Sequence, residues 1–354
     1  MIINHNYYLD LAFQIAERNL GHTGLNPSVG TVIVKNGTVI SFGLTSINGK
    51  PHSEFNALNN LKNCSGATLY TTLEPCVHYG RTPPCVNIII KKKIKNVYYA
   101  FEDPDPRTFK KAKKILNEKG IRSKLIRSNK YSKFYKSYFI NKKSFTPLIN
   151  AKIAISKDYL TINKKNKWVT NSTSRKIVHF LRSRYDCILS TSKSINHDNS
   201  LLNCRINGLN NNKPDLFIVD LNLKLKKNLS LNNYIKNRKI YIITNKKNAR
   251  RTLVYKKKGY KIILIKSLDN KDDFKFLFKK IYKMGYSRML VEVGLTFLNV
   301  LLKNKFIHDL YIFKSSKKLG NIGKNNSTTK YLKRIFPKSL TINLNGDNLL
   351  KKEF

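Results

Sequence analysis

Three short segments of the sequence place one histidine, one glutamate and two cysteines in a fixed order. The segments are residues 51–54 (PHSE), 74–76 (EPC) and 83–85 (PPC). A histidine and a glutamate two residues apart at a helix start supply one metal ligand and one base from adjacent turns. A cysteine after a proline at a second helix start supplies a thiolate that the helix dipole stabilises. His52, Cys76 and Cys85 are therefore the predicted zinc ligands. Glu54 is predicted to be a general acid/base that does not bind the metal.

The spacing of the two cysteines differs from that of the generic zinc-deaminase pattern, H-x-E followed by P-C-x-x-C. Here eight residues rather than two separate Cys76 from Cys85, which indicates a subgroup with a longer loop. In the alternative interpretation, His52 lies at a surface helix cap and both cysteines are buried core thiols. The ordered combination, with a proline before each cysteine, favours the metal site.

Length and composition indicate a soluble protein of about two domains. The chain has 354 residues, of which 41% are hydrophobic, enough for buried cores. No stretch approaches the ~18 apolar residues of a membrane helix, and the N-terminus lacks the pattern of a secretory signal. We therefore expect a cytoplasmic location, with Cys64, Cys187 and Cys204 as ordinary buried thiols.

The net charge of +48 raises the question of a nucleic-acid partner. The chain contains 68 Lys and Arg residues but only 20 Asp and Glu residues. However, the lysines are scattered through every segment, as compositional drift would place them. We therefore interpret most of them as solvated surface residues and expect only nonspecific nucleic-acid binding at low salt.

The first 145 residues alternate helix and strand patterns, which predicts a three-layer α/β domain. Helices are expected at 7–18, 53–61 and 84–92, and strands at 30–34, 38–43, 67–71 and 97–100. The second part, 146–354, contains short apolar runs typical of buried strands, at 148–155, 187–190, 216–219, 240–244, 261–265 and 289–292. Helical patterns at 172–184 and 274–285 separate some of these runs, so a second α/β sheet is expected. The tail beyond about 321 is expected to be partly loose, with 311–313 and 340–344 as candidate closing strands.

Longer motifs resemble one known family. Residues 72–85 read TLEPCVHYGRTPPC, residues 26–30 read NPSVG, and residues 103–106 read DPDP. These segments resemble the bifunctional deaminase–reductases of riboflavin biosynthesis, whose patterns are T-L-E-P-C-S-H-x-G-R/K-T-P-P-C, N-P-x-V-G and D-P-N-P. The resemblance, which runs to about residue 320, implies a cytidine-deaminase-like domain followed by a dihydrofolate-reductase-like domain.

For the first domain, the resemblance implies zinc-dependent hydrolytic deamination of a diaminopyrimidinone that carries a ribosyl phosphate. Asn26, His78 and Arg81 match positions that would hold this substrate, and Arg81 would suit its phosphate. The family usually has a Gly-x-Gly turn where this chain has Lys110-Lys111-Ala112. We therefore expect a different loop there.

For the second domain, the resemblance implies NADPH-dependent reduction of the ribosyl group to a ribityl chain. The positions that would bind substrate are Lys152, Asn166, Arg182, Leu202, Arg205 and Glu292. Arg182 and Arg205 would suit its phosphate. The positions that would bind the cofactor are Ala154, Trp168, Thr170, Ser194, Asp198, Gly294 and Thr296. No G-x-G-x-x-G motif supports a Rossmann site instead.

Departures from the family pattern are concentrated in this second domain. Tyr159 stands where the family has a turn glycine, and Leu221 stands where it has a serine after a strand aspartate. The family's Asp-Asp-Pro is replaced by Asp198-Asn199-Ser200. One alternative is therefore a deaminase with a degenerate reductase domain. Others are a nucleic-acid deaminase or basic binding protein, and a zinc-stabilised structural module. The sequence leaves homo-oligomer formation open.

Overall fold

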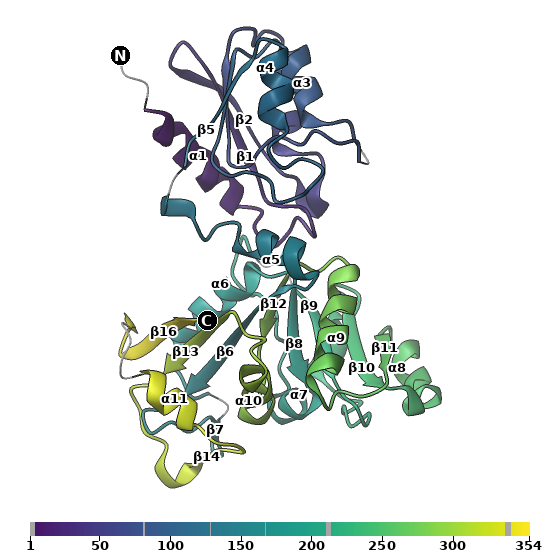
Figure 1. The fold of residues 1–354 in the computed structure, drawn as a ribbon. Helices are drawn as coiled ribbons and strands as arrows, with labels where there is room; N and C mark the ends of the chain where they lie inside the picture. The colour runs from purple at the N-terminus through teal and green to yellow at the C-terminus, as the bar shows by residue number, and fades with distance from the viewer. Residues whose placement is uncertain (1–3, 81, 128, 167, 210–213, 337–340) are drawn as a thin grey trace. The chain divides into compact units, whose positions relative to one another are not determined.

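The computed structural model describes residues 4–80, 82–127, 129–166, 168–209, 214–336 and 341–354 (Figure 1). The chain divides into two compact units, residues 1–145 and 146–354. Within the described ranges, none of the helices has the length and apolar character needed to cross a membrane.

The first unit is built on a five-stranded sheet with the order β2-β1-β3-β4-β5. Its strands are β1 (Gly30–Lys35), β2 (Thr38–Leu44), β3 (Thr68–Thr71), β4 (Asn96–Tyr99) and β5 (Arg122–Leu125). The strand β1 is antiparallel to β2 and β3, and the pairs β3–β4 and β4–β5 are parallel. The helices are α1 (His5–Glu17), α2 (Ser53–Leu58), α3 (Cys85–Lys91), α4 (Ala112–Glu118) and α5 (Lys136–Ser144).

Alternating side chains of the central strand β1 place helices on both faces of this sheet. Val32 and Val34 pack with residues of α1 and α5, including Phe13 and Tyr138. Ile33, between them in the strand, packs with residues of α2, α3 and α4. Because successive side chains in a strand point to opposite faces, this apolar run is buried on both sides. The predicted three layers are therefore present.

The second unit is built on a nine-stranded sheet with the order β11-β10-β9-β8-β12-β6-β13-β16-β15. Its strands are β6 (Leu148–Ile155), β8 (Cys187–Thr191), β9 (Asp215–Val219), β10 (Ile240–Asn245), β11 (Lys261–Ile265), β12 (Arg288–Val291), β13 (Asp309–Lys314), β15 (Ile342–Leu344) and β16 (Asp347–Glu353). The strands from β11 to β13 are parallel, and β16 and β15 continue the sheet in antiparallel pairing. A separate antiparallel ribbon pairs β7 (Ile162–Asn163) with β14 (Gly323–Lys324).

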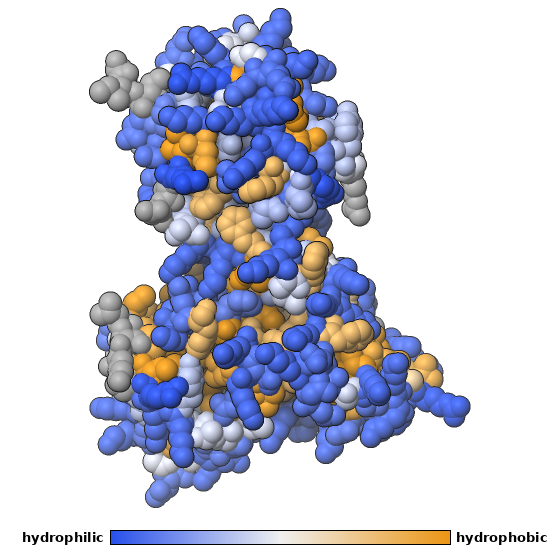
Figure 2. Space-filling model, in the orientation of Figure 1, coloured by the Kyte–Doolittle hydropathy of each residue, from blue (hydrophilic) through white to orange (hydrophobic). Residues whose placement is uncertain are grey.

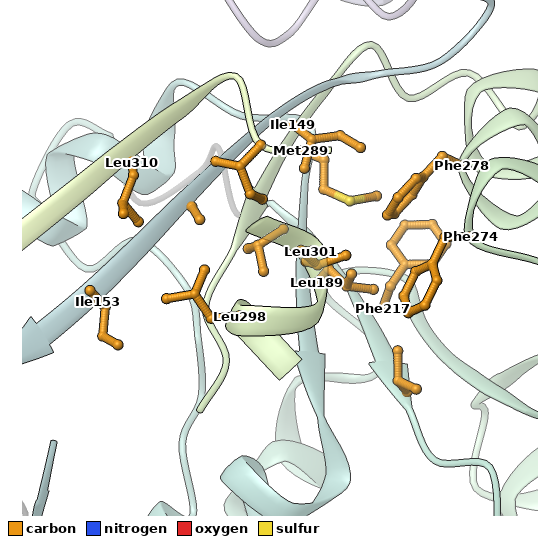
Figure 3. Close-up of a cluster of buried hydrophobic side chains, with 14 of the residues drawn as sticks. Ile149, Ile153, Leu189, Phe217, Phe274, Phe278, Met289, Leu298, Leu301 and Leu310 are labelled. Carbon is orange, nitrogen blue, oxygen red and sulfur yellow. The ribbon is translucent and has the colours of Figure 1, made fainter. Parts of the chain in front are cut away.

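Helices cover both faces of this sheet as well. They are α6 (Ser172–Ser183), α7 (Ser192–Asp198), α8 (Leu253–Lys257), α9 (Lys271–Lys283), α10 (Leu295–Lys303) and α11 (Lys330–Ile335). Figure 3 shows the core on one face, where Phe274 and Phe278 of α9 and Leu298 of α10 lie against strand residues such as Phe217 and Met289. The opposite face has its own buried cluster, which includes Ile188, Leu216 and Ile242.

The described part of the tail forms the closing strands expected near 311–313 and 340–344, as β13 and β15, while residue 340 lies outside the described residues. The expectation of a partly loose tail beyond about 321 does not hold there, because β16 pairs with β13 along the whole of that strand, from Asp309 opposite Glu353 to Lys314 opposite Asn348. The buried residues Leu344 and Leu350 explain this order, because they pack into the apolar clusters of the second unit. Hydrophilic side chains cover most of the face of the molecule shown in Figure 2, in keeping with the 68 Lys and Arg residues.

Candidate functional site

The predicted metal ligands of the first unit lie together. The ligand atoms of His52, Cys76 and Cys85 are all within 4.8 Å of one another. The Nδ1 atom of His52 is 3.3 Å from the Sγ atom of Cys85 and 3.6 Å from that of Cys76. His52 is the N-cap residue of α2, Cys76 lies in the loop after β3, and Cys85 is the first residue of α3. One imidazole and two thiolates form the donor set of a zinc site that keeps a fourth position open.

The pKa values of the two thiols of this cluster are shifted in opposite directions. Hydrogen bonds from the Cys85 thiol and from His52 lower the pKa of Cys76 to about 4, and the backbone N–H of Cys85 also donates to its Sγ atom at 3.3 Å. The pKa of Cys85 is raised because this thiol holds the proton shared with Cys76 and because it is buried. The hydrogen bonds of the pair thus favour the thiolate form on Cys76. A divalent cation favours deprotonation of both.

Glu54 lies beside the cluster without belonging to it. Its carboxylate is buried, and burial followed by the nearby Cys76 thiolate raises its pKa. The Oγ atom of Ser53 donates to its Oε2 atom at 3.1 Å, and that hydroxyl is in turn 2.8 Å from the Oγ1 atom of Thr31 in β1. Glu54 is therefore a carboxylate held in place by the sheet, with a raised proton affinity suited to acid/base chemistry.

Two of the three predicted substrate positions in this unit can be described. Asn26 donates from Nδ2 to the backbone oxygen of Gly49 at 3.0 Å, so it is tied to the loop that leads to His52. His78 lies in the loop between the two cysteines, with Nδ1 3.0 Å from the Oγ1 atom of Thr108. Arg81 lies outside the described residues.

The loop that was expected to differ from the family pattern is fixed by Glu74. The buried carboxylate of Glu74 accepts hydrogen bonds from the backbone N–H groups of Asp103, Lys110 and Ala112 at 3.2, 3.1 and 3.0 Å. Lys110, where the family usually has the first glycine of its turn, has φ 58°. The backbone therefore has a left-handed conformation typical of glycine although the residue is lysine.

In the second unit, one cavity of about 840 Å³ collects nearly all of the predicted reductase residues. The predicted residues that line it are Lys152, Ala154, Trp168, Thr170, Arg182, Ser194, Asp198, Leu202, Arg205, Glu292, Gly294 and Thr296. Asn166 is not among the lining residues, so its prediction as a substrate ligand is not supported. Asn166 is exposed in a turn in which its backbone N–H donates to the Oδ1 atom of Asn163 at 3.0 Å.

A buried ion-pair cluster lies in this cavity. The Glu292 carboxylate accepts hydrogen bonds from Arg182 at 2.6 and 3.0 Å, and Lys152 Nζ lies 3.4 Å from its Oε2 atom. Burial alone would raise the pKa of Glu292, but the two cations outweigh burial and lower it to about 2. The pKa of Lys152 is lowered, mainly by burial and against the attraction of Glu292. The cluster therefore keeps a carboxylate and a proton-bearing amine side by side away from bulk water.

Arg182 is held in place by this cluster. Its guanidinium group binds Glu292 through two nitrogens and donates from the third to the backbone oxygen of Asn203 at 3.1 Å. Among the described residues, these bonds use three of its five N–H donors, so its contact with the substrate phosphate stays a prediction. Arg205 is exposed at the cavity, donates to the Oδ1 atom of Asn203 at 2.6 Å, and is the second candidate for that anion.

Comparison with known proteins identifies both halves of the chain. Residues 2–101 match the family described as the cytidine and deoxycytidylate deaminase zinc-binding region, and residues 147–342 match the RibD C-terminal domain. The riboflavin biosynthesis protein RibD of Aquifex aeolicus is 31% identical over 88% of this chain and 87% of its own length. The chain belongs to the RibD family. RibD of Buchnera aphidicola is 32% identical over 90% of this chain and 88% of its own length.

Solved RibD structures support the same assignment. RibD of Acinetobacter baumannii superposes with a TM-score of 0.83 at 25% identity, over 98% of each chain. A deaminase/reductase of Thermotoga maritima shares the fold, with a TM-score of 0.79 at 23% identity. The predicted family and both predicted domain folds are thus confirmed, as are the two enzyme classes, zinc and NADPH as cofactors, and a small pyrimidine substrate.

Several cavity residues of this RibD protein were not predicted. His179 and Asn326 are examples that line the same cavity. His179 lies one turn before Arg182 in α6, so helical spacing gave a signal for it. Burial, together with the charges of Arg182 and Arg205, lowers the pKa of His179 to about 4, so it is neutral. Asn326 follows the ribbon strand β14, and no local pattern pointed to it.

Tyr159, which stands where the family pattern has a turn glycine, has a left-handed backbone with φ 63°. Its ring lies under Lys314 Nζ at 4.1 Å from the centroid, and its hydroxyl accepts a hydrogen bond from the same ammonium at 3.0 Å. The neighbouring Asp158 accepts from the backbone N–H groups of Leu319 and Gly320 at 3.1 and 2.8 Å. These contacts hold the turn in place although its residue is not glycine.

Proposed function

We propose that this RibD protein deaminates a diaminopyrimidinone ribosyl phosphate in its first domain, residues 1–145. The product would then be reduced to the ribityl compound in the second domain, residues 146–354. The observation that carries the two-step assignment is that each unit assembles a complete set of reactive groups. These are a histidine–dithiol cluster with a separate buried glutamate in one unit, and a carboxylate–lysine–arginine cluster inside a large cavity in the other.

For deamination, His52, Cys76 and Cys85 would hold zinc, which activates a water molecule for attack when bound. The Glu54 carboxylate would accept a proton from that water and deliver it to the departing amino group. The carbon–nitrogen bond of the ring amine breaks, a carbonyl forms, and ammonia leaves. His78 and Asn26, on the loops that flank the cluster, would hold the pyrimidine, and Arg81 its phosphate.

For reduction, NADPH supplies the hydride when it is bound in the cavity. The first carbon of the ribosyl group would accept the hydride as its bond to the ring oxygen opens, and that oxygen takes a proton to become a hydroxyl. Lys152 Nζ is the proposed proton source, because burial lowers its pKa and Glu292 holds it in place. Arg182 would hold Glu292, and Arg205 would bind the phosphate of the substrate. Leu202 would line the substrate end.

The proposed cofactor contacts lie along the same cavity. Ala154, Trp168, Thr170, Ser194, Asp198, Gly294 and Thr296 would contact NADPH. Gly294 has no Cβ atom, which leaves room for a close approach of the cofactor to the backbone. A cavity of about 840 Å³ is large enough for a nucleotide cofactor and substrate atoms together.

The pair of variants Glu54→Gln and Lys152→Met tests this assignment. We expect Glu54→Gln to lower ammonia release by a factor of ~100–10,000 while zinc content stays at one ion per chain. We expect Lys152→Met to abolish NADPH oxidation and to leave ammonia release unchanged. The exposed Glu118→Gln is the matched control for the first variant. Full deaminase activity in Glu54→Gln would contradict the proposed acid/base role.

The remaining expectations concern partners and location. We propose that the +48 chain binds nucleic acid only nonspecifically, so that RNA binding is lost as salt rises to about 0.2 M. RNA binding that persists above this salt concentration would favour a specific nucleic-acid role instead. A cytoplasmic location stays a prediction from the sequence, and homo-oligomer formation stays open.

A further inference from the structure

The space beside the backbone of Gly294 is bordered by side chains from separate parts of the second unit. A Cβ atom at Gly294 would lie 3.6 Å from the Nδ2 atom of Asn326 and 3.9 Å from the Oγ atom of Ser194. Ser194 belongs to α7, Gly294 precedes α10, and Asn326 follows β14. All three residues line the cavity. The missing Cβ thus leaves a small recess with one amide and one hydroxyl at its edge.

Asn326 is held at this recess through its backbone and its neighbour. Its backbone oxygen accepts a hydrogen bond from the Oγ1 atom of Thr296 at 3.2 Å. The side chain of the adjacent Asn325 accepts from the N–H and hydroxyl groups of Thr161 at 2.9 and 3.0 Å and donates to the backbone oxygen of Tyr159 at 2.9 Å. Within the described part of the chain, the side-chain amide of Asn326 itself has no hydrogen-bond partner. The backbone of Asn326 is thus held at the recess, and its exposed side-chain amide can bind a ligand.

The groups at this recess suit an anionic oxygen ligand. The Nδ2 atom of Asn326 is a donor, and the Ser194 hydroxyl can donate as well. Lys193, which also lines the cavity, adds a positive charge next to Ser194. Hydrogen bonds from such donors to phosphate oxygens are charge-assisted and therefore strong.

We propose that Asn326 is a cofactor-binding residue that donates a hydrogen bond from Nδ2 to the diphosphate of NADPH. This inference rests on the proposed placement of the cofactor in the cavity. The diphosphate fits better than the 2′-phosphate of the adenosine, because Gly294 lies only two residues after Glu292, which marks the substrate end. In NADPH, the diphosphate is closer to the reacting nicotinamide than the 2′-phosphate is. The segment after β14 thus completes a site that the sequence motifs assign to other residues.

The test is a titration of the full-length, zinc-loaded protein with NADPH in the absence of substrate, followed by the fluorescence of the reduced nicotinamide. We expect Asn326→Ala to bind NADPH about fivefold more weakly, which is the loss of one hydrogen bond. We expect Asn326→Asp to bind it at least ~50-fold more weakly, because a carboxylate would face the diphosphate. Asn321→Asp makes the same change in the same segment, outside the cavity lining, and is expected to bind like the wild type.

Two further measurements distinguish a wrong diphosphate contact from a wrong placement of the cofactor. NADH, which lacks the 2′-phosphate, is expected to show the same fold-losses, and a loss seen only with NADPH would overturn the diphosphate contact. Gly294→Ala fills the recess at ordinary van der Waals distances and is expected to weaken NADPH binding. Weakened binding in Gly294→Ala with wild-type binding in both Asn326 variants would overturn the inference and leave the cofactor site standing. Wild-type binding in all three variants would overturn the placement of the cofactor as well.

Discussion

The metal cluster and the reductase cavity are assembled over very different distances in the sequence. All three metal ligands lie within residues 52–85, at the starts of two helices and in one loop of the first unit. In the second unit, Glu292 meets a partner 110 residues away in the sequence, Arg182, because strand β12 lies between β8 and β6 in the sheet. A short motif can therefore specify the first site, whereas the second depends on the packing of the whole sheet.

This comparison predicts that the two activities can be separated. The largest effect is expected from removal of zinc with a chelator, or from Cys76→Ser, both of which should abolish ammonia release. NADPH oxidation with the already deaminated substrate should remain, since the cavity residues all lie in the second unit. The two activities are measured on the same sample, and the buried Cys64→Ser is the matched control. Loss of both activities on chelation would show that the reductase activity depends on the metal site and would contradict this prediction.

The second prediction concerns the long-range ion pairs. Arg182→Met should lower the free energy of unfolding by about 3 kcal/mol, because it leaves the buried Glu292 with only Lys152 as a partner. Urea unfolding followed by circular dichroism measures this change. In Arg182→Met/Glu292→Met/Lys152→Met all three charges of the cluster are gone, and we expect much of the lost stability to return. If the triple variant were no more stable than Arg182→Met, the buried charge left on Glu292 would not be the cause.

The third prediction uses two buried carboxylates with opposite pKa shifts. Burial raises the pKa of Asp103 in the first unit to about 6, whereas its value in the unfolded chain is about 3.8. The folded state then binds more protons than the unfolded state, so the contribution of Asp103 to stability falls as pH rises from about 3.8 to 6. Glu292 has a lowered pKa of about 2, so its contribution is present above about 4.5 and is lost as pH falls toward 2.

Melting temperatures across this pH range measure the contrast. Asp103→Asn should be more stable than the wild type above pH 6, by up to about 3 kcal/mol, and equal to it below about pH 4. Glu292→Gln should be less stable than the wild type at pH 7, and the difference should shrink as pH falls below about 4.5. The same sign of pH dependence for both variants would contradict the assigned environments.

The smallest effects are expected at Lys110 and Tyr159, two left-handed residues that stand where the family pattern has glycine. Lys110→Gly should raise the free energy of unfolding by about 0.5–1 kcal/mol, because a lysine with φ 58° carries steric strain. Tyr159→Gly should raise the free energy of unfolding by less than Lys110→Gly does, or lower it, because it removes the contacts of the tyrosine ring and hydroxyl with Lys314. Chemical denaturation of both variants gives the values. A larger gain for Tyr159→Gly would show that these contacts do not offset the strain.

The sequence was informative where chemistry and spacing coincide. The clustering of His52, Cys76 and Cys85 and most strands were predicted from local patterns, since alternating or continuous apolar runs form the buried strands. The strand β16, the contact of Arg182 with Glu292 and the cavity residue Asn326 were not, because each depends on partners distant in the chain. Asn166 lies in a local turn outside the cavity lining, so its role as a substrate ligand stays a prediction.

The coupled reaction of the full chain tests the two-step assignment. The zinc-loaded protein is supplied with NADPH and the diaminopyrimidinone ribosyl phosphate, and ammonia and NADPH absorbance are recorded together. We expect one NADPH to be oxidised for each ammonia released. We also expect Glu54→Gln to stop both signals until the deaminated substrate is added, when NADPH oxidation resumes. Ammonia release without any NADPH oxidation, even with the deaminated substrate, would show that the second domain has lost its reaction and would contradict the two-step assignment.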